Sequence, residues 1–550
     1  MNKYPGFPWS ANPLLALPFV LLLGSVDLCR ASAATVPDGY ATIQLGIDSG
    51  ADTILVRAGS YPENVLLTPP VQRVLMADPA ASARPTLQGL ALQASDGESE
   101  PMKVVGLRIS TQVVLLSGPP SAVMEFEGCL FEAGIGFAGE YGVQTIRDCV
   151  IRGHTSMMVG SFTMERDTVE AGGMSLAPTS GLSVRNCWFR GPGIGAEPYG
   201  ALAGLSARAR SPIYADVSDN VFENCQVGVA LFEMGTMHVT NNRIRNCSAW
   251  GMVFHEYSLL EVTGNDVRQC GIGIQSWGND RTRITGNTVV GATENGIELS
   301  CDYDPVEVRN NIVLRCLGSG MRLTSSQWGS SPLLLTGNTS ALNSQSGYDL
   351  AFANTYPPGS NLGVSNNVGY GNGDWGFRWS GNDTPTLGCN DWFANAAGPV
   401  SGIAPGATDV AVNPLFCDLP HDDVSLRSDS PLLGGACGAI GAAGAGCSMP
   451  VGVDAEIGSA SFGLRSIGPN PMSGEIAIEY ALPRPAAIEI TILDLMGRQM
   501  DRLVAGVQSP GMHVATWNGE ARGKRVGPGV YFVRLTWPEG RQARRILLRR

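Results

Sequence analysis

Charged residues are scarce in this sequence. They make up 16% of the 550 residues, and the formal net charge is −12. Proteins that bind nucleic acid concentrate Lys and Arg where they meet phosphates, so this composition argues against a nucleic-acid partner. No CxxC motif is present, and no two of the five His have zinc-binding spacing. The GxSxG and P-loop motifs are missing, and no GxGxxG lies between a strand and a helix.

Long apolar runs are also missing, except near the start of the chain. The run from Leu14 to Val26 follows a single Lys and precedes the small residues "ASAAT". This pattern predicts a signal peptide over residues 1–33, cleaved after Ala33. Cys29 lies in "VDLC", a poor lipobox, so we expect no lipid anchor. No later run approaches the roughly 18 residues of a membrane helix. We therefore expect a protein secreted or held at the outer cell surface, with no membrane span after signal removal.

A repeat dominates what the chain does contain. "VTNNRIRNC" (239–247) returns as "VTGNDVRQC" (262–270), and related segments define three recurring slots. The asparagine slot holds Asn220, Asn242, Asn265, Asn287, Asn311, Asn338 and Asn367, preceded by Leu107, Cys129, Cys149, Asp167 and Cys187 and followed by Cys389 or Asn390. The cysteine slot, five residues on, holds Cys225, Cys247, Cys270 and Cys316. The glycine slot holds Gly228, Gly251, Gly273, Gly296, Gly320, Gly347 and Gly376.

Each repeat is a set of short alternating apolar runs broken by Asn and Gly, which predicts strands and turns. The units are too short to hold a crossover helix as well, so we expect about a dozen coils stacked in parallel about 4.8 Å apart. Asn tolerates the left-handed conformation of a sharp turn, and its amide can bond to the Asn above and below. We assign Gly to the other tight turn and Cys to the interior.

This pattern resembles the right-handed parallel β-helix of the pectin-lyase-like superfamily, over about residues 36–447. "YATIQLGIDSGADTILVRAGSYPENVLL" (40–67) is similar to the family's first coil, which has a cap helix, a strand and then "GxYxEN". The resemblance implies an all-β fold, with a cap and first coils over 34–100 and the β-helix with its closing segment over 101–447. It implies almost nothing about activity.

The repeat fades from about Gly398. "DVAVNPLFCDLPHDDVSLRSDSPLLGG" resembles the closing segment of secreted β-helix proteins. We expect a loop disulfide between Cys437 and Cys447 and a second one between Cys389 and Cys417, although the sequence alone does not fix these pairings. The signal peptide contains Cys29, so its removal leaves twelve of the thirteen Cys.

Residues 448–461 are predicted to be a linker, and 462–550 a small β-sandwich. The last segment contains "PNP", "LP", "DLMGR", "WNG" and "GVYFVRL" and ends in "RRILLRR". It resembles the FlgD-like immunoglobulin fold and the C-terminal sorting domains of type IX secretion. The resemblance implies that this domain interacts with secretion machinery, as a cleaved signal or as a retained surface module.

Known catalytic motifs of the superfamily are absent. The aspartate motifs of pectin methylesterases, the "NTD", "GHG" and "RIK" set of polygalacturonases and the "WIDH" of pectate lyases do not occur. The "GxYxE" of the methylesterases does occur, at Gly59, Tyr61 and Glu63, but without its partners we assign it to a turn in the first coil. No catalytic residue is therefore assigned, and the protein is left open as an enzyme.

One polar patch attracts attention just after the glycine slot. Consecutive coils place there Phe232, Glu233, His255, Glu256, Trp277, Asp280, Asp302 and Asp304. Superposed coils would make these residues one patch about 15 Å long, in which aromatic rings and carboxylates suit sugars. The acids could instead hold Ca²⁺, although no cofactor is evident, and solvated turn residues remain the favoured alternative. An Arg column, Arg243, Arg245 and Arg268, could neutralise an acidic sugar. Singly, Trp250, Trp277 and Trp328 are assigned to packing.

Three function classes follow from these observations. The first is a surface protein that binds polysaccharide through a face of the solenoid. The second is a polysaccharide lyase or glycoside hydrolase with an unrecognised site. The third is a structural or adhesive surface rod without a small-molecule site.

Overall fold

The chain divides into two compact units, Met1–Ser448 and Met449–Arg550. The computed structural model describes residues 32–549 apart from 68–72, 94–100, 116–122, 138–141, 192–193, 197–200, 210, 279–280, 302–304, 326–331, 354–360, 449–461, 469–471, 473–475, 509–510 and 522. The predicted signal peptide and linker lie almost wholly outside the described residues. Ser32 donates its backbone N–H to Asp52, and the first strand begins at Ala33, where cleavage is expected. None of the described helices is long and apolar enough to cross a membrane.

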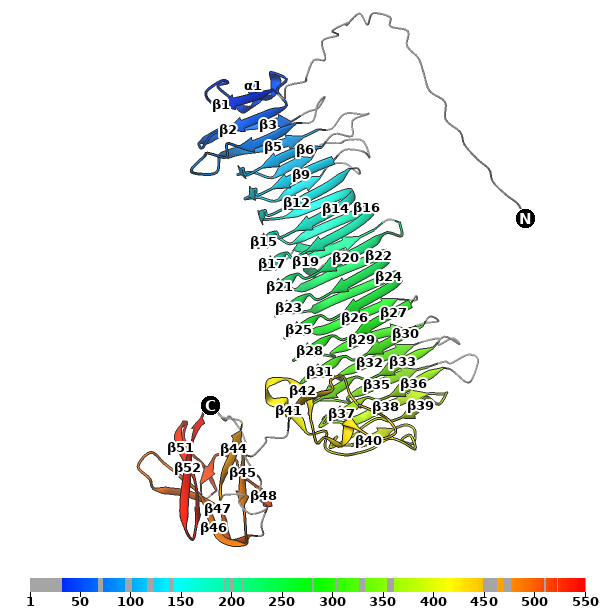
Figure 1. Cartoon of the computed structure of the whole chain (residues 1–550), viewed down its shortest axis with the longest axis vertical. Helices are drawn as coiled ribbons and strands as arrows, with labels where there is room; N and C mark the ends of the chain where they lie inside the picture. The colour runs from blue at the N-terminus through cyan, green and yellow to red at the C-terminus, as the bar shows by residue number, and fades with distance from the viewer. Residues whose placement is uncertain are drawn as a thin grey trace, which may run out of the picture. The chain divides into compact units, whose positions relative to one another are not determined.

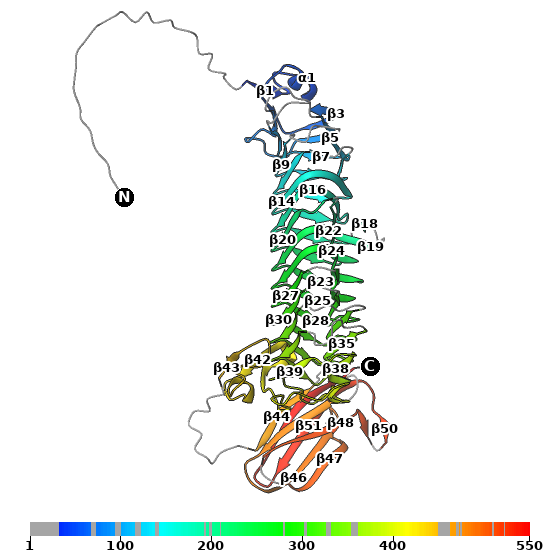
Figure 2. The same cartoon turned by 90° about the vertical axis from the view of Figure 1, so that its right-hand side faces the viewer.

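Unit 1 is a parallel β-helix of about sixteen turns. Its strands stack in three ladders, A, B and C, which run the length of the unit (Figures 1 and 2). Among the described strands of the ladders almost every pairing is parallel, as predicted; the exception is β18 (Ile194–Ala196), which is antiparallel to β19 (Ala201–Arg208). The turns exceed the expected dozen because the first coils, built on β1 (Ala33–Val36), β2 (Thr53–Val56) and β4 (Val74–Ala77), carry no recognisable slot residues.

Ladder A ends at the asparagine slot. It contains β1 (Ala33–Val36), β2 (Thr53–Val56), β4 (Val74–Ala77), β6 (Met102–Val105), β9 (Val123–Glu127), β12 (Val143–Arg147), β20 (Tyr214–Ser218), β27 (Arg281–Thr285), β30 (Val306–Arg309), β33 (Leu333–Thr336), β36 (Leu362–Ser365) and β39 (Thr386–Gly388). Four long strands run from ladder C into ladder A: β14 (Thr155–Glu165), β16 (Met174–Arg185), β22 (Val227–Thr240) and β24 (Trp250–Thr263).

Ladder B follows the slot, and ladder C follows ladder B. Ladder B contains β7 (Arg108–Ile109), β10 (Leu130–Phe131), β13 (Val150–Arg152), β15 (Thr168–Glu170), β17 (Trp188–Arg190), β21 (Val221–Glu223), β23 (Arg243–Arg245), β25 (Asp266–Arg268), β28 (Thr288–Val290), β31 (Ile312–Leu314), β34 (Thr339–Ala341) and β37 (Val368–Tyr370). Ladder C contains β8 (Val113–Leu115), β11 (Ile135–Phe137), β19 (Ala201–Arg208), β26 (Ile272–Gly278), β29 (Ile297–Cys301), β32 (Met321–Ser325), β35 (Tyr348–Phe352), β38 (Trp375–Gly381) and β40 (Gly398–Ser401). Strands β3 (Ser60–Leu67) and β5 (Thr86–Leu92) serve both ladders.

The asparagine slot faces the interior. Asn242 donates its backbone N–H and its Nδ2 to Oδ1 of Asn265, at 2.8 and 3.0 Å. The same two bonds link every step from Asn220 to Asn390, and Asp409 accepts the last pair. Each amide therefore satisfies backbone groups that the turn would otherwise leave buried and unpaired.

Two of our turn assignments were wrong. The left-handed residue is the one before the asparagine slot, such as Asn241 at φ 55° or Gly264 at φ 67°, because the slot residue itself must point its amide inward. None of the seven glycine-slot residues has a positive φ. They are glycine because a Cβ would collide with the next coil: at Gly251 it would lie 2.5 Å from both Gly273 O and Val267 Cγ1.

The cysteine slot also faces inward. Cys225, Cys247, Cys270 and Cys316 are buried free thiols, as are Cys129, Cys149, Cys187 and Cys301. Beyond Cys316 the slot is occupied by Asn, and these residues form a second amide ladder that we did not predict from the sequence. The Cys316 N–H bonds to Asn343, which is followed by Asn372 and Asn395.

The N-terminal end of the β-helix is closed by α1 (Ile43–Asp48). Thr42 caps this helix through Leu45 N–H. Glu63 accepts the N–H groups of Ile43 and Gln44, at 2.9 and 3.2 Å. The "GxYxE" segment therefore lies mostly in β3 rather than in a turn, and its carboxylate satisfies backbone donors at the start of the helix.

The other end is covered by a strap, residues 409–447, that folds back over ladder B. It contains β41 (Phe416–Asp418), β42 (Asp423–Arg427), β43 (Ala445–Cys447) and the short 3₁₀ turns Leu419–His421 and Pro431–Leu433. Val424 packs with Leu314 and Ala341, and Leu426 packs with Val368. Asp422 forms ion pairs with Arg268, at 2.6 Å, and with Arg315.

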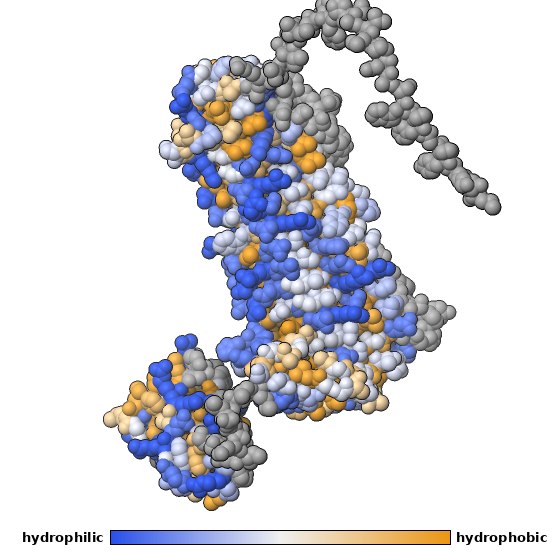
Figure 3. Space-filling view, viewed as in Figure 1, coloured by the Kyte–Doolittle hydropathy of each residue, from blue (hydrophilic) through white to orange (hydrophobic). Residues whose placement is uncertain are grey.

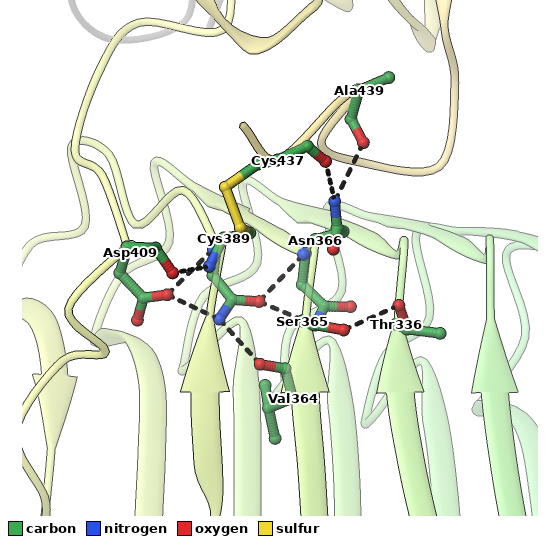
Figure 4. Close-up of a disulfide and its surroundings, with 11 residues drawn as sticks. Thr336, Val364, Ser365, Asn366, Cys389, Asp409, Cys437 and Ala439 are labelled. Carbon is green, nitrogen blue, oxygen red and sulfur yellow. Dashed lines mark hydrogen bonds between the residues drawn. A yellow bond between two sulfur atoms is a disulfide. The ribbon is translucent and has the colours of Figure 1, made fainter. Parts of the chain in front are cut away.

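The disulfides are Cys389–Cys437 and Cys417–Cys447. The same four residues were expected to be paired, but the pairings Cys437–Cys447 and Cys389–Cys417 were wrong. The strap carries Cys437 over the last turn, where Asn366 Nδ2 donates to the Cys437 carbonyl at 2.9 Å (Figure 4). The first disulfide therefore joins the strap to the β-helix, and the second lies within the strap sheet.

Unit 2 has two antiparallel sheets around one apolar core. One sheet has the order β44 (Gly463–Gly468), β45 (Ile476–Leu482), β48 (Gly511–Trp517), and the other β47 (Gln499–Gln508), β46 (Ala486–Leu493), β51 (Gly529–Trp537), β52 (Gly540–Leu548). A hairpin pairs β49 (Glu520–Ala521) with β50 (Lys524–Arg525). Ile478 and Trp517 of the first sheet share the core with Ile490 and Val533 of the second.

Candidate functional site

A hollow of about 490 Å³ opens where ladder C turns into ladder A. Its wall includes Glu233, His255, Glu256, Tyr257, Ser258 and Trp277. These residues come from three consecutive coils, on β22, β24 and β26. We call this hollow the groove; it coincides with much of the patch predicted from the sequence.

Strand register explains why these residues meet. Phe232 pairs with His255, and His255 pairs with Trp277, so their side chains project from the same face of ladder C. Arg208 precedes Phe232 in the same row, and Ser300 follows Trp277. The rings of His255 and Trp277 stand edge to face with their centroids 6.1 Å apart.

Phe232 does not serve the groove as an exposed platform. It is 2% exposed and packs with Ala203, Ala230 and Val253. Trp250 packs against the same cluster, and Trp277 also contacts it while lining the groove. Trp277 and Trp250 are both half-buried, but of the two only Trp277 lines the groove.

Two carboxylates lie at the turn beside these rings. Glu233 and Glu256 both have a left-handed backbone, with φ of 56° and 51°. Arg208 hydrogen-bonds to Glu233, and this contact lowers the pKa of Glu233 below its usual range. The Glu256 side chain is 60% exposed, with its Oε1 3.5 Å from His255 Nδ1. One carboxylate is therefore already neutralised by a cation, and the other faces solvent.

The floor of the groove is fixed by hydrogen bonds. Tyr257 is 4% exposed, and its hydroxyl lies 2.5 Å from Ser276 Oγ and 2.8 Å from Thr282 Oγ1. A Cβ at Gly278 would lie 2.0 Å from the Tyr257 ring, so glycine there makes room for the ring. Sequence reasoning missed Tyr257 and Ser258, because their role depends on how the coil turns.

Three predicted acids, Asp280, Asp302 and Asp304, lie outside the described residues, as does Trp328. Among the residues that are described, no group of three or more His, Cys, Asp or Glu is placed to hold a metal ion.

The predicted Arg column lies on ladder B, away from the strands that form the groove. Arg245 contacts Asp266 at 3.3 Å, and Arg268 contacts both Asp266 and Asp422. Arg243 is exposed on β23. The structure therefore does not bring this column to the aromatic patch. Residues one to three positions after the asparagine slot lie on ladder B, whereas the patch lies at the end of ladder C.

The outer face of ladder A shows the same use of charge for pairing. Lys103 contacts Glu127 at 2.5 Å, and Arg283 contacts Glu261 at 2.6 Å. On the side of unit 1 seen in Figure 3, hydrophilic residues cover much of the surface, with hydrophobic residues scattered among them. The charged residues named on the outer face of ladder A each face a partner of opposite sign one coil away.

Comparisons with known proteins agree with the fold. Residues 203–368 match the family model "Right handed beta helix region". The repeat of unit 1 is therefore a right-handed parallel β-helix. The matched segment contains the coils that form the groove. No curated protein matches the sequence.

Solved structures resemble the chain only distantly. The periplasmic alginate epimerase AlgG is 15% identical, with a TM-score of 0.36, over 58% of this chain and 75% of that one. Tailspike protein 3 of bacteriophage CBA120 is 10% identical, with a TM-score of 0.39, over 67% and 60%. The catalytic domain of a GH87 α-1,3-glucanase is 8% identical, with a TM-score of 0.22, over 70% and 68%. Similarities at this level carry no argument about activity.

Proposed function

We propose that this protein binds a polysaccharide in the groove on β22, β24 and β26. The observation that carries the proposal is a half-buried indole, Trp277, beside the carboxylates of Glu233 and Glu256 in a hollow of about 490 Å³. Aromatic faces stack on the apolar faces of sugars, and carboxylates accept hydrogen bonds from hydroxyl groups. Concave sites with an apolar wall and a few fixed polar groups are typical binding sites.

Binding fits the groove better than general acid catalysis does. A general acid must hold a proton near neutral pH, which requires a raised pKa. Arg208 has the opposite effect on Glu233, since it stabilises the ionised carboxylate. The buried Tyr257 hydroxyl is occupied by Ser276 and Thr282, so it contributes rigidity rather than a free proton donor.

The test is retention on a panel of neutral, acidic and amino-sugar polysaccharides by affinity electrophoresis. Trp277→Ala should weaken retention at least about tenfold, since stacked aromatics dominate such contacts. Trp188→Ala is the matched control, because Trp188 is a 41% exposed tryptophan on ladder B and should bind like the wild type. A rod without a sugar site predicts no retention by any form.

The same incubations distinguish binding from cleavage. New reducing or unsaturated ends that disappear in Trp277→Ala would show that the groove belongs to a lyase or hydrolase. Retention without new ends supports the binding role. Retention that Trp277→Ala leaves unchanged would move the site away from the groove.

We further propose that the protein is exported and acts at the cell surface or in the medium. The support is the apolar segment with its small-residue pattern for cleavage after Ala33, together with unit 2. Its two sheets over a shared core suit the immunoglobulin-like sandwich that its motifs resemble, and we assign it to sorting or attachment. Deleting residues 462–550 should leave unit 1 folded but retain it in the periplasm of a host with type IX secretion. Full export of the truncated protein would contradict the assignment.

A further inference from the structure

The charge of the groove indicates which kind of sugar it can take. Its described lining contains two carboxylates, Glu233 and Glu256, and one imidazole, His255, but no Lys or Arg. The nearest cation along the row, Arg208, is paired with Glu233. Arg281, four residues after Trp277 in the same coil, lines a separate hollow of about 280 Å³ with Arg283 and Glu307. A uronate chain would therefore bring its carboxylates to a wall that already carries negative charge.

Among the described residues, Glu256 has no ion pair with Arg or Lys, unlike several other glutamates of the β-helix. Glu127, Glu165 and Glu261 each face an Arg or Lys of a neighbouring coil. Glu256 is 60% exposed, and its described contact is the 3.5 Å approach of His255. It lies one residue from His255, which contacts the Trp277 ring edge to face. A carboxylate beside an aromatic ring is a favourable environment for an ammonium group, which gains a charge-assisted hydrogen bond and a cation–π contact.

On the basis of the proposed binding function, we infer that the groove selects a polysaccharide with free amino sugars. In this arrangement the Glu256 carboxylate accepts hydrogen bonds from the sugar ammonium group, and the Trp277 indole packs against the ring that carries it. Glu233 remains paired with Arg208 and does not compete for the amine.

The probes are two glucosamine polymers, one β-1,4 and one β-1,6 linked, each in its free-amine and its fully N-acetylated form. Acetylation removes the charge and leaves the backbone unchanged. Oligogalacturonate of the same length is the acidic probe. Binding is measured by titration calorimetry in a mildly acidic buffer, which keeps the amine of the polymer protonated. The full chain should bind at least one free-amine polymer about tenfold or more tightly than its acetylated form.

Three variants test the site. Glu256→Gln keeps the shape of the side chain and should abolish the preference for the amine, and Trp277→Ala should weaken binding of both forms. Glu223→Gln, on ladder B, makes the same change in net charge and should behave like the wild type. A preference that survives Glu256→Gln would reveal general attraction to an acidic protein and overturn the inference.

Equal binding of the two forms, no binding of either amine polymer, or tighter binding of oligogalacturonate would also overturn it. These outcomes leave the proposed function intact if any polysaccharide still shows retention that depends on Trp277. If no polysaccharide does, the proposed function itself fails.

Discussion

The coils before Asn220 and the coils from Asn220 onward fill the same inward slot with different chemistry. The later coils carry an uninterrupted amide ladder, in which each Asn satisfies backbone groups of its neighbours. The earlier coils have Leu107, Cys129, Cys149, Asp167 and Cys187 there, all buried. In both halves the residue before the slot has a left-handed backbone conformation, whatever its type. The backbone turn is therefore tolerant of its inward occupant. The earlier coils share its hydrogen bonding only in part, as where Asp167 accepts the Cys149 N–H and Asn220 accepts the Cys187 N–H.

The outer face of ladder B also changes along the chain, but further on, between Arg268 and Val290. In the earlier coils it carries alternating charges, with Arg152 between Glu132 and Glu170 at 3.2 and 2.9 Å. In the later coils its outward residues are Val290, Leu314, Ala341 and Tyr370, which the strap covers. Asp422 of the strap binds Arg268 at the boundary between the two. The exposed part of ladder B thus presents charged side chains to water, and the part under the strap buries apolar side chains.

The largest effect should come from breaking the amide ladder. Asn265 bonds through its side chain to Asn242, Val239, Thr263 and Asn287. Replacing it by Leu leaves several buried groups without partners, each costing about 1–3 kcal/mol. Urea denaturation should show a loss of at least about 3 kcal/mol, or no soluble protein should be recovered.

The matched change in the earlier coils is Cys129→Ala. It removes one buried sulfur atom, whose contacts are to the carbonyls of Val104 and Glu127 at 3.5 Å, and should cost about 1 kcal/mol. Equal losses in the two variants would mean that the amide ladder adds nothing beyond packing.

The second effect is a gain in stability from Asp167→Asn. Burial raises the pKa of Asp167 to about 7, although it accepts N–H bonds from Cys149 and Glu165. The folded state therefore holds a proton that the unfolded state has lost, so the stability contribution falls as pH rises from about 4 to 7 and stays low above that. Asp167→Asn should raise the free energy of unfolding by on the order of 2 kcal/mol at pH 8 and by little at pH 4.

Melting curves across this pH range check the sign. Asp148→Asn is the control, because hydrogen bonding to Arg166 lowers the pKa of Asp148. Its neutralisation should reduce stability above pH 4 rather than increase it. A gain for Asp167→Asn that is constant with pH would remove ionisation as the cause.

A smaller loss should follow from Asp422→Ala in the strap. Burial tends to raise the pKa of Asp422, but hydrogen bonds from Arg268 and Arg315 outweigh it and the pKa is lowered. Removing the carboxylate leaves two half-buried cations facing each other and should cost about 1–2 kcal/mol at neutral pH. The loss should vanish in acid, where the wild-type carboxylate becomes protonated. Hydrogen exchange should rise in β25, β28 and β31 and remain unchanged in β13 and β15.

The smallest effect is expected on the exposed charge ladder. Arg152→Ala removes contacts to two glutamates, but Arg152 and Glu170 are exposed and Glu132 is half-buried. Solvent screens such pairs, so the thermal midpoint should not change measurably. A shift as large as that of Asp422→Ala would show that the exposed ladder acts as a cooperative network.

The sequence predicted the parallel β-helix because the slots repeat at nearly constant spacing. It also predicted much of the groove, since equal offsets from the glycine slot place Phe232, His255 and Trp277 in adjacent coils, with Glu233 and Glu256 one residue further on. It misassigned the left-handed residue, because Asn241 and Asn242 are chemically identical and only the coil shows which one turns the chain. It also misassigned the role of the glycine slot. A position where the next coil leaves no room for a Cβ requires glycine, just as a position with a positive φ favours it, and the sequence does not distinguish the two causes.

By itself, the sequence determined the architecture of unit 1, because a parallel stack depends on local periodicity that each coil repeats. Only the tertiary structure decided the disulfide pairing, the partners of Arg268 and the separation of the Arg residues from the groove. These features depend on the strap, whose residues 409–447 reach back to coils that lie far earlier in the chain. No periodicity encodes such a contact. It arises because the apolar face of ladder B gains more by burial under the strap than by exposure to water.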